Sequence, residues 1–308
     1  MLDTTPMREF IDLSFGAEMQ QLREEIALWI KRSDVEMQET LEWQFVANSK
    51  YFRPLTVFSS YTAMRGGEIP PSIIRGALLI ELFHNVSLVI DDIVDHSEYR
   101  RDKATLYKKF GELQALMASG YIVADAYCMA AEDIGTITLF SELMKRLAVA
   151  ECMQWRLRRQ PSGVEDWRKL AAEDTGSMFE VAACLGDRSE RLRKFGGLLG
   201  LLYHGCDDVA DVRGTTALGG GGFDDLRDGI LTLPAALAIR NPKVANMFCN
   251  PSEDNLTSLA SAFQASLPEA ERYLDGISEE ARTEARLFAN RPEPLLALVE
   301  QTRRLSQR

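Results

Sequence analysis

Two acidic clusters of one pattern are the residues of this chain best suited to chemistry. The first is Asp91-Asp92-Ile93-Val94-Asp95 and the second is Asp207-Asp208-Val209-Ala210-Asp211. The outer aspartates of each cluster stand four residues apart, so on a helix they share a face. Carboxylates this close are costly to bury without a cation, and hard oxygen ligands suit Mg²⁺, which shares its coordination with water and substrate phosphates. The pair predicts a metal clamp for a diphosphate, with all six aspartates as catalytic metal ligands.

A solvated acidic face is the ordinary interpretation of one such cluster in a chain with 46 acidic residues. The flanking sequences favour the metal site instead. Residues 86–90 precede the first cluster and residues 198–203 precede the second, and both runs are mainly apolar. Helices of this kind are expected to be buried on most sides, and buried carboxylates need a compensating charge.

A histidine and two arginines accompany the first cluster. His84 precedes Asp91 by about two helical turns, roughly 10 Å, on the same face. This placement favours a ligand role for His84 over a purely structural one. Arg100 and Arg101 follow the cluster, and their planar guanidinium groups match the oxygens of a phosphate.

The composition narrows the classes of function. A net charge of −11 argues against sequence-independent nucleic-acid binding. The five cysteines are odd in number and lack CxxC spacing, so we expect buried thiols in a reducing compartment and a cytoplasmic protein. Residues 1–6 lack a basic start and an apolar core, so no signal peptide is expected. No apolar stretch is expected to approach the ~18–20 residues that span a bilayer.

Helical periodicity runs through nearly the whole chain, and we see no convincing run of alternating strands. Residues 16–32, for example, place apolar side chains near a 3.6-residue repeat. Helices are expected over 16–32, about 70–97, 107–133, 136–159, 164–185, 188–213, 224–240, 252–265, 268–290 and 293–306. The prediction is an all-α fold in which residues 1–308 form a single domain, a helical bundle around a central cavity.

Several segments, taken together, resemble the trans-isoprenyl diphosphate synthase (polyprenyl synthetase) family. The resemblance runs from about Ser49 to the C-terminus. Lys50 and Arg53, which alone would be typical of a solvated face, stand in a segment similar to GKxxRP. Glu151 and Gln154 stand in one similar to GExxQ, and residues 224–234 resemble DLxxGKxTLP. The two aspartate clusters correspond to the family's two aspartate-rich regions, so the combination is specific although no single motif is.

This resemblance implies an isoprenoid synthase-like fold, a homodimer and a prenyl transfer. Three Mg²⁺ ions would bridge both clusters to the diphosphate of an allylic substrate, whose departure leaves an allylic carbocation. The double bond of isopentenyl diphosphate would attack that cation. By position, Lys50, Arg53, His84 and Arg101 would hold isopentenyl diphosphate, and Arg100 would help hold the allylic diphosphate.

The chain departs from the family where the allylic diphosphate is expected to bind. Asp174, Gly220 and Ile230 each stand where the family has a lysine, and Asp174 reverses the charge. Thr175, which corresponds to the threonine of the family's KTxxLF segment, is assigned to catalysis. His204 replaces a glutamine and is assigned to substrate binding; it could bind metal, steady a carbocation or merely pack. Each lost charge-assisted hydrogen bond is worth ~1.5–3 kcal/mol.

Retention of the isopentenyl-diphosphate residues favours chain elongation, the condensation of an allylic diphosphate with isopentenyl diphosphate to a longer trans-polyprenyl diphosphate. Val86 and Ser87 are small and leave the cavity open along the helix, which resembles synthases of products with about twenty carbons or more. Phe83, Met117 or Tyr121 could close the cavity lower down.

Two alternatives stay open because the lysines are missing. The first is a class I terpene cyclase, or a prenyltransferase with a non-standard acceptor, on the same scaffold. The second is a weakly active regulatory subunit that pairs with an active synthase. Arg303 or Arg304 could supply a replacement cation at the cavity mouth, although a solvated C-terminal tail is the more ordinary interpretation.

Overall fold

The computed structural model describes residues 14–45, 50–100, 103–214 and 226–307. In chain order the α-helices are α1 (Gly16–Arg32), α2 (Val35–Phe45), α3 (Phe52–Met64), α4 (Pro71–Val94), α5 (Leu106–Phe110), α6 (Glu112–Met129), α7 (Ile134–Leu157), α8 (Val164–Ala171), α9 (Ser177–Asp187), α10 (Arg193–Val212), α12 (Leu233–Ala238), α13 (Pro242–Cys249), α14 (Glu253–Phe288) and α15 (Glu293–Arg303). The predicted all-α fold is confirmed.

Three short elements interrupt or extend the helices. A π-helical turn, η1 (Ala172–Gly176), joins α8 to α9, and a 3-10 turn, η2 (Arg304–Gln307), follows α15. Two strands of two residues each, β1 (Tyr99–Arg100) and β2 (Lys103–Ala104), pair antiparallel just after the first aspartate cluster. The sequence did not predict this hairpin, because two-residue strands are too short to give an alternating pattern.

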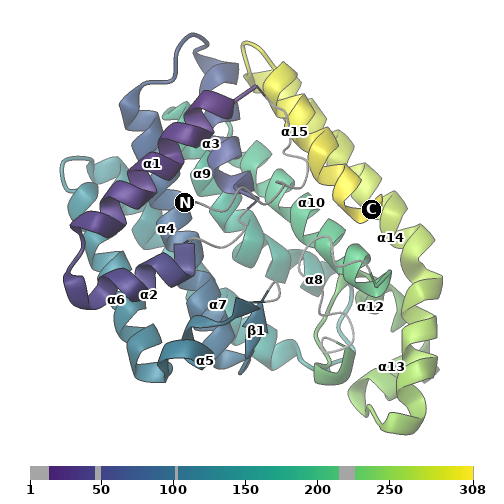
Figure 1. Cartoon of the computed structure of the whole chain (residues 1–308). Helices are drawn as coiled ribbons and strands as arrows, with labels where there is room; N and C mark the ends of the chain where they lie inside the picture. Colours follow the sequence, from purple (N-terminus) through teal and green to yellow (C-terminus); the bar gives the residue numbers. More distant parts are fainter. Residues whose placement is uncertain (1–13, 46–49, 101–102, 215–225, 308) are drawn as a thin grey trace.

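The helices surround a core that runs the length of the described chain. In Figure 1, α1 and α6 lie at one side, α14 and α15 at the other, and α4, α9 and α10 between them. One continuous cluster of buried apolar side chains extends from Phe15 to Leu305. Its fully buried aromatic members include Phe58, Phe140 and Trp167, each worth ~1.5–3 kcal/mol of burial.

Several predicted helix boundaries were wrong, each for a local reason. The helix expected over 107–133 divides at Gly111, whose φ of +89° favours glycine. The helix expected over 224–240 is interrupted by Gly229, with φ of +70°, and α12 then begins after Thr232, whose side chain accepts from the backbone N–H of Ala235. The helices α2, α3 and α13 were not predicted as separate elements.

The two C-terminal helices expected over 252–265 and 268–290 are one helix, α14, which continues through Pro268. A proline inside a helix costs ~3 kcal/mol or more. The buried stripe of α14 nevertheless continues on both sides of Pro268, from Leu256 and Phe263 to Leu274 and Ile277. Packing of this stripe on the bundle offsets the proline's cost.

Two expectations about the environment of the chain also need correction. By length and composition α4 could cross a membrane, contrary to the expectation that no stretch is long and apolar enough. Its most apolar window has a mean hydropathy of 1.7 and is 72% buried inside the protein, as the core helix of a bundle would be. The five cysteines are free thiols, but Cys128 and Cys152 are exposed and not buried.

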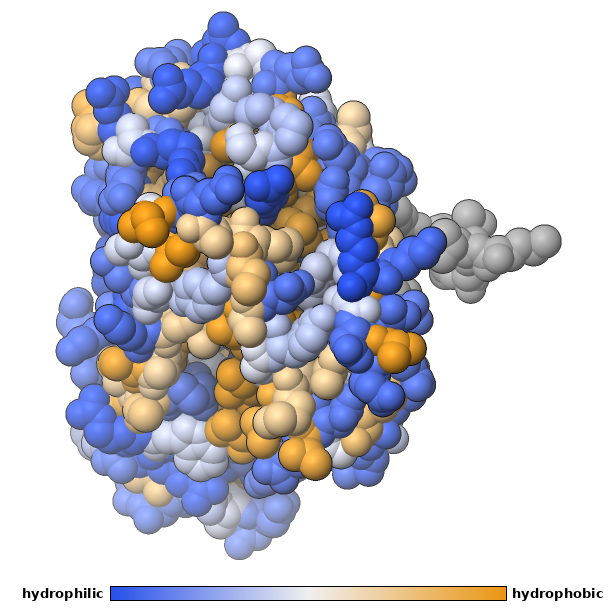
Figure 2. Space-filling view, turned by 90° about the vertical axis from the view of Figure 1, so that its left-hand side faces the viewer, coloured by the Kyte–Doolittle hydropathy of each residue, from blue (hydrophilic) through white to orange (hydrophobic). Residues whose placement is uncertain are grey.

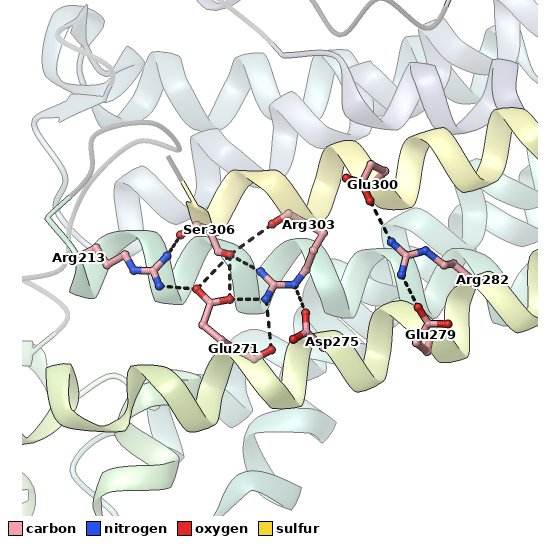
Figure 3. Close-up of polar contacts among 8 residues, drawn as sticks. All are labelled: Arg213, Glu271, Asp275, Glu279, Arg282, Glu300, Arg303 and Ser306. Atoms are coloured by element: carbon pink, nitrogen blue, oxygen red, sulfur yellow. Dashed lines mark hydrogen bonds and ion pairs between the residues drawn. The ribbon is translucent and has the colours of Figure 1, made fainter.

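The C-terminal arginines do not supply a replacement cation at the aspartate clusters. Arg303 is 7% exposed and donates from Nε to Asp275 Oδ1 of α14 at 2.8 Å. It also pairs with Glu271 and donates from Nη1 to Ser306 Oγ at 2.6 Å (Figure 3). Arg304 is exposed and donates to Glu300 at 3.1 Å. The C-terminus is therefore anchored on α14 by Arg303, and it is neither a solvated tail nor a source of charge for the site.

Candidate active site

The first aspartate cluster lies at the end of α4 and forms ion pairs with two arginines. Asp92 is 3% exposed and accepts from Arg100 Nε of β1 at 2.8 Å. Asp95, the residue that caps α4, is exposed and accepts from Arg158 Nη2 at 2.7 Å. Asp91, which directly precedes Asp92, is half-buried. Asp92 is thus fixed within the protein, while Asp91 and Asp95 stand nearer to solvent.

Asp91 faces other acids from two further elements. Burial, together with the negative charges of Asp174 and Glu151, raises the pKa of Asp91 well above its usual range. Arg100 offsets part of this effect and Asp95 adds to it. These acids come from α4, α7 and η1, and their charges repel one another. We call the region between Asp91, Glu151 and Asp174 the acidic space. A hard cation in that space would relieve the repulsion, so the donor set fits Mg²⁺.

The acidic groups do not by themselves form a closed metal site. Within the described ranges, no three histidine, cysteine or acidic side chains are grouped closely enough to hold one ion. Glu151 Oε1 is buried and, among the described residues, has no hydrogen-bond partner. Such a set fits an ion that keeps water and phosphate oxygens in its coordination sphere, as Mg²⁺ usually does.

The second aspartate cluster lies on α10 and is fixed by neutral donors. Asp208 is 9% exposed, and its Oδ2 accepts from Trp167 Nε1 at 2.7 Å and from the backbone N–H of Leu233 at 2.8 Å. Asp207 and Asp211 are partly exposed on the same helix. The middle aspartate of each cluster therefore holds elements together, which leaves the outer pair better placed for a cation.

Close packing of α10 on η1 sets where the second cluster lies. A Cβ atom at Gly200 would fall 2.7 Å from Gly176 Cα and 2.8 Å from Thr175 O, so only glycine permits this approach. Arg146 of α7 clamps the other side of the turn through ion pairs of 2.7 Å with Glu173 and with Glu180. The π-helical turn, which the sequence did not predict, is thereby held rigidly; such turns are frequent at functional sites.

The turn η1 carries the charge-reversed position and brings it to His204. His204 Nδ1 lies 2.9 Å from Thr175 Oγ1 and 3.3 Å from Asp174 Oδ2, and Thr175 Oγ1 donates to the same carboxylate oxygen at 2.9 Å. His204 Nε2 lies 3.8 Å from Asp208 Oδ1. Burial lowers the pKa of His204, but Asp208 and Asp174 outweigh it and raise that pKa to about 9. At neutral pH this position therefore holds an imidazolium.

Two of the residues predicted to hold isopentenyl diphosphate, Arg53 of α3 and His84 of α4, are in contact. Lys50 lies two residues before α3, and Arg53 lies in the first turn of that helix. Arg53 Nη1 is 3.2 Å from His84 Nε2, its Nε donates to Met178 Sδ at 2.8 Å, and its guanidinium lies 5.2 Å from the ring centre of Phe179. Arg53 and His84, which the family resemblance assigns to the same substrate, are therefore in contact.

A pocket connects the two groups of cationic residues. It is lined by His84, Asp92, Arg100 and Lys103, together with residues of α2. The residue predicted for isopentenyl diphosphate and the one predicted for the allylic diphosphate thus face one space. Arg101 and Gly220 lie outside the described residues.

The end of α7 contributes a residue that the motifs did not predict, Arg158, which reaches the first cluster. A signal was present, since residues 156–159 contain three arginines directly after the GExxQ-like segment. Trp167 was also missed, and nothing in its local sequence distinguishes it from an ordinary core tryptophan.

An aromatic group lies below the aspartates between α4, α6 and α7. The ring of Phe83 stacks on Phe140 at 4.2 Å and meets Tyr127 edge-on at 5.7 Å. Val86 is buried and Ser87 partly exposed on the same helix. Met117 is 53% exposed, so the expectation that it could close the cavity is wrong for a single chain. Tyr121 accepts a hydrogen bond from the backbone N–H of Asp34 at 3.0 Å.

Comparison with solved structures shows the same fold over almost the whole chain. Heptaprenyl diphosphate synthase from Staphylococcus aureus superposes with a TM-score of 0.86 at 20% identity, covering 97% of this chain and 99% of that one. Polyprenyl synthase from Caulobacter crescentus, solved with calcium and isoprenyl diphosphate, gives a TM-score of 0.85 at 23% identity, covering 98% and 99%.

Sequence comparison agrees with the fold. Geranylgeranyl pyrophosphate synthase 3 of Arabidopsis thaliana, a chloroplastic protein by its name, is 28% identical over 257 residues, covering 73% of this chain and 69% of that protein. The family model described as Polyprenyl synthetase matches residues 35–264. This match covers most of the chain and agrees with the observed fold. The chain therefore belongs to the polyprenyl synthetase family and is a transferase.

Proposed function

We propose that this chain condenses an allylic diphosphate with isopentenyl diphosphate in an Mg²⁺-dependent reaction that yields a longer trans-polyprenyl diphosphate. The contact of 3.2 Å between Arg53 and His84 is the observation that carries this proposal. This contact supports a binding site for a second diphosphate, because Arg53 and His84 together offer hydrogen-bond donors to its oxygens. A terpene cyclase has one diphosphate substrate and gains nothing from such a pair.

The outer aspartates of the two clusters would hold the metal. Asp91 and Asp95 on one helix and Asp207 and Asp211 on the other would bind Mg²⁺, three ions by the family resemblance. Bound there, Mg²⁺ supplies neutralisation of the negative charge that develops on the leaving diphosphate oxygen. Asp92 and Asp208 would act mainly as anchors, since their oxygens already accept hydrogen bonds from Arg100 and from Trp167.

The protein's own groups would orient both substrates. Arg100 would bind the allylic diphosphate, while Lys50, Arg53, His84 and Arg101 would bind isopentenyl diphosphate. The bond between C1 and oxygen of the allylic substrate breaks, and the double-bond carbon of isopentenyl diphosphate bonds to C1. The new bond forms at the terminal carbon of that double bond and leaves a cation on C3 of the isopentenyl unit. A proton then leaves C2 to the released diphosphate, which restores a double bond between C2 and C3.

Thr175 and His204 would line the reacting space. With His204 protonated, its Nδ1 donates to the Thr175 hydroxyl, which donates to Asp174. These hydrogen bonds would orient the Thr175 hydroxyl. One lone pair of its oxygen would then be free to stabilise the carbocation. The apolar walls around it would keep water from the carbocation.

The aromatic group below the aspartates bears on product length. We propose a product of about twenty carbons or more, because small Val86 and Ser87 leave space along α4 between Asp91 and Phe83. A cytoplasmic location and one domain over residues 1–308 remain parts of the same proposal. The uninterrupted core from Phe15 to Leu305 supports the single domain.

A homodimer would cover apolar side chains that the single chain exposes. Leu113, Leu116 and Met117 of α6 and Ile134 and Val149 of α7 are between 43% and 74% exposed. Figure 2 looks onto the side where Figure 1 places α6 and shows apolar side chains gathered amid mainly hydrophilic ones. Light scattering on the purified chain would test this, with a mass of about twice 34.5 kDa expected.

A product assay tests the proposed reaction. Allylic diphosphates of five to twenty carbons would be supplied with Mg²⁺, with and without isopentenyl diphosphate, and diphosphates and volatile hydrocarbons analysed by mass spectrometry. A longer diphosphate that forms only with isopentenyl diphosphate is expected. A hydrocarbon or alcohol formed without it would contradict elongation.

The pairing of Asp174 with His204 favours a second candidate, a terpene cyclase or a prenyltransferase with another acceptor. Asp174 stands where the family has a lysine, so the neutral pair Asp174–His204 replaces a positive charge there. Ile230 replaces a second lysine with an uncharged side chain. The same assay separates these candidates through cyclic products or products with added acceptors. A regulatory subunit would give little product alone and recover activity only with a partner synthase.

A further inference from the structure

The side chain of Arg158 lies beside the first aspartate cluster and is fixed there by its neighbours. It follows α7 directly, and its Nη2 donates to Asp95 Oδ1 at 2.7 Å, with 14% of its side chain exposed. Its guanidinium stacks over the ring of Trp155, with Cζ 3.8 Å from the ring centre. An exposed ion pair alone would leave such a side chain mobile. Burial and stacking hold this one in place.

One donor of Arg158 is not used within the described structure. Its Nε is buried and has no hydrogen-bond partner among the described residues. The same side chain acts electrostatically on Glu151, whose Oε1 is also buried without a hydrogen-bond partner there. A buried N–H normally finds an acceptor. A phosphate oxygen in the acidic space would provide one.

Arg159, the next residue, links this end of α7 to the segment around Ile230, where the family resemblance places a lysine. The backbone N–H of Arg159 donates to Gly229 O at 2.9 Å, and its Nη2 donates to Arg227 O at 3.2 Å. Gly229 has φ of +70°, and a Cβ there would lie 2.4 Å from Arg159 Cγ. The residue after Gly229 is Ile230, which stands where the family resemblance places lysine. Arg158 is therefore braced next to the position that lost its positive charge.

We propose that Arg158 binds the diphosphate of the allylic substrate and supplies, from the end of α7, the positive charge that Ile230 does not. Asp95 holds the guanidinium near the site, and a metal ion on Asp95 would leave the guanidinium's donors to the phosphate oxygens. This inference rests on the proposed function, because it needs an allylic diphosphate at the first cluster. It explains how a member of this family could bind that substrate without the lysines.

The test measures binding in the absence of turnover. Farnesyl thiolodiphosphate, an allylic analogue that resists ionisation, would be titrated with Mg²⁺ into the full-length chain and into Arg158→Gln by calorimetry. We expect Kd to rise about tenfold to a hundredfold, the loss of one charge-assisted hydrogen bond to a charged group. Binding of isopentenyl diphosphate should change less than twofold. Arg156→Gln, an exposed arginine at the same end of α7, is the matched control and should leave both affinities unchanged.

A second variant separates charge from structure. Ile230→Lys added to Arg158→Gln should restore most of the lost affinity, because the lysine would stand beside the brace between Arg159 and Gly229. Thermal melts of all variants identify any that fail to fold, and the double variant then decides. If Arg158 is only a counter-ion for Asp95, Arg158→Gln would bind the analogue as tightly or more tightly, and the inference would be overturned.

Failure of the proposed function gives a different result. If the chain binds the analogue and Arg158→Gln weakens that binding, while no elongated product forms, then Arg158 binds the diphosphate but the enzyme is not an elongating synthase. If the unmodified chain does not bind the analogue with Mg²⁺, the inference about Arg158 is wrong.

Discussion

The two walls that we propose to bind diphosphates differ in the charges of their residues. On the isopentenyl-diphosphate wall, Arg53 and His84 come together as the family resemblance implies. On the allylic wall, Asp174 pairs with His204, and Ile230 carries no charge. The first wall keeps the residues that the family resemblance expects there. The second has lost the expected residues, so its function must come from a different arrangement of charges.

On the allylic wall, the negative charge of Asp174 is compensated by the neighbouring His204. Burial raises the pKa of Asp174, but hydrogen bonding and the charge of His204 more than offset it and lower that pKa. The pair Asp174–His204 is then a carboxylate beside an imidazolium, with no net charge where a lysine would have one. This leaves a deficit of positive charge on that wall, and Arg158, which pairs with Asp95 of the first cluster, is proposed to reduce it.

The largest effect is expected from breaking the isopentenyl-diphosphate wall. Arg53→Leu should lower kcat/KM for isopentenyl diphosphate by about a hundredfold to a thousandfold, through loss of about two charge-assisted hydrogen bonds. Affinity for the allylic substrate should change little. Steady-state kinetics with each substrate varied in turn would measure this, with the exposed Arg75→Leu on α4 as control. Equal losses for both substrates would contradict two separate walls.

The next effect concerns the charge-reversed pair. Asp174→Lys should reduce allylic kcat/KM about tenfold to a hundredfold, because the new cation would face His204 and Arg53. Asp174→Lys with His204→Gln removes that repulsion and should recover most of the activity. A double-mutant cycle should give a coupling of about 1–2 kcal/mol. Additive losses would mean that the two side chains act independently.

A smaller effect is expected from the anchor of the second cluster. Trp167→Phe removes the hydrogen bond to Asp208 and some core volume, and should cost about 2–4 kcal/mol of folding free energy. It should also raise KM for the allylic substrate several-fold, since Asp208 would lose one of the two hydrogen bonds that fix its Oδ2. Trp29→Phe, which removes the hydrogen bond from Trp29 to Asp125 on the far side of the bundle, is the control. It should lower Tm without changing KM, and an equal change in KM would argue against an anchoring role.

The smallest effect should be on product length. Phe83→Leu would open the aromatic group formed with Tyr127 and Phe140 and should shift the product distribution toward chains one isoprene unit longer. Leu287→Ala on α14 should leave the distribution unchanged because that side chain is exposed and lies outside the proposed dimer face. Mass spectrometry of the diphosphate products would compare the two, and an unchanged distribution for Phe83→Leu would remove Phe83 from the cavity floor.

The sequence predicted the fold class and the residues near the site better than it predicted their contacts. Spacing placed Asp91 and Asp95 on one helical face, and the structure puts both at the end of α4. Helix boundaries failed at Gly111 and Pro268, where backbone conformation and tertiary packing decided against the local signal.

Contacts made across the bundle left little trace in the sequence. Trp167 reaches Asp208 only because α8 packs beside α10, and Arg158 reaches Asp95 across the end of α7. The π-helical turn that aims Asp174 and Thr175 at His204 depends on the close approach of Gly200, which no local pattern indicates. Such features follow from how helices pack and not from the periodicity of any one of them.

Incorporation of carbon-13 from labelled isopentenyl diphosphate is the most direct test of the central claim. The purified chain would be incubated with Mg²⁺, an unlabelled allylic diphosphate and the fully labelled partner. The account predicts a diphosphate product whose mass rises by five labelled carbons for each unit added, and no product in excess chelator. Turnover of the allylic diphosphate to unlabelled products would contradict it.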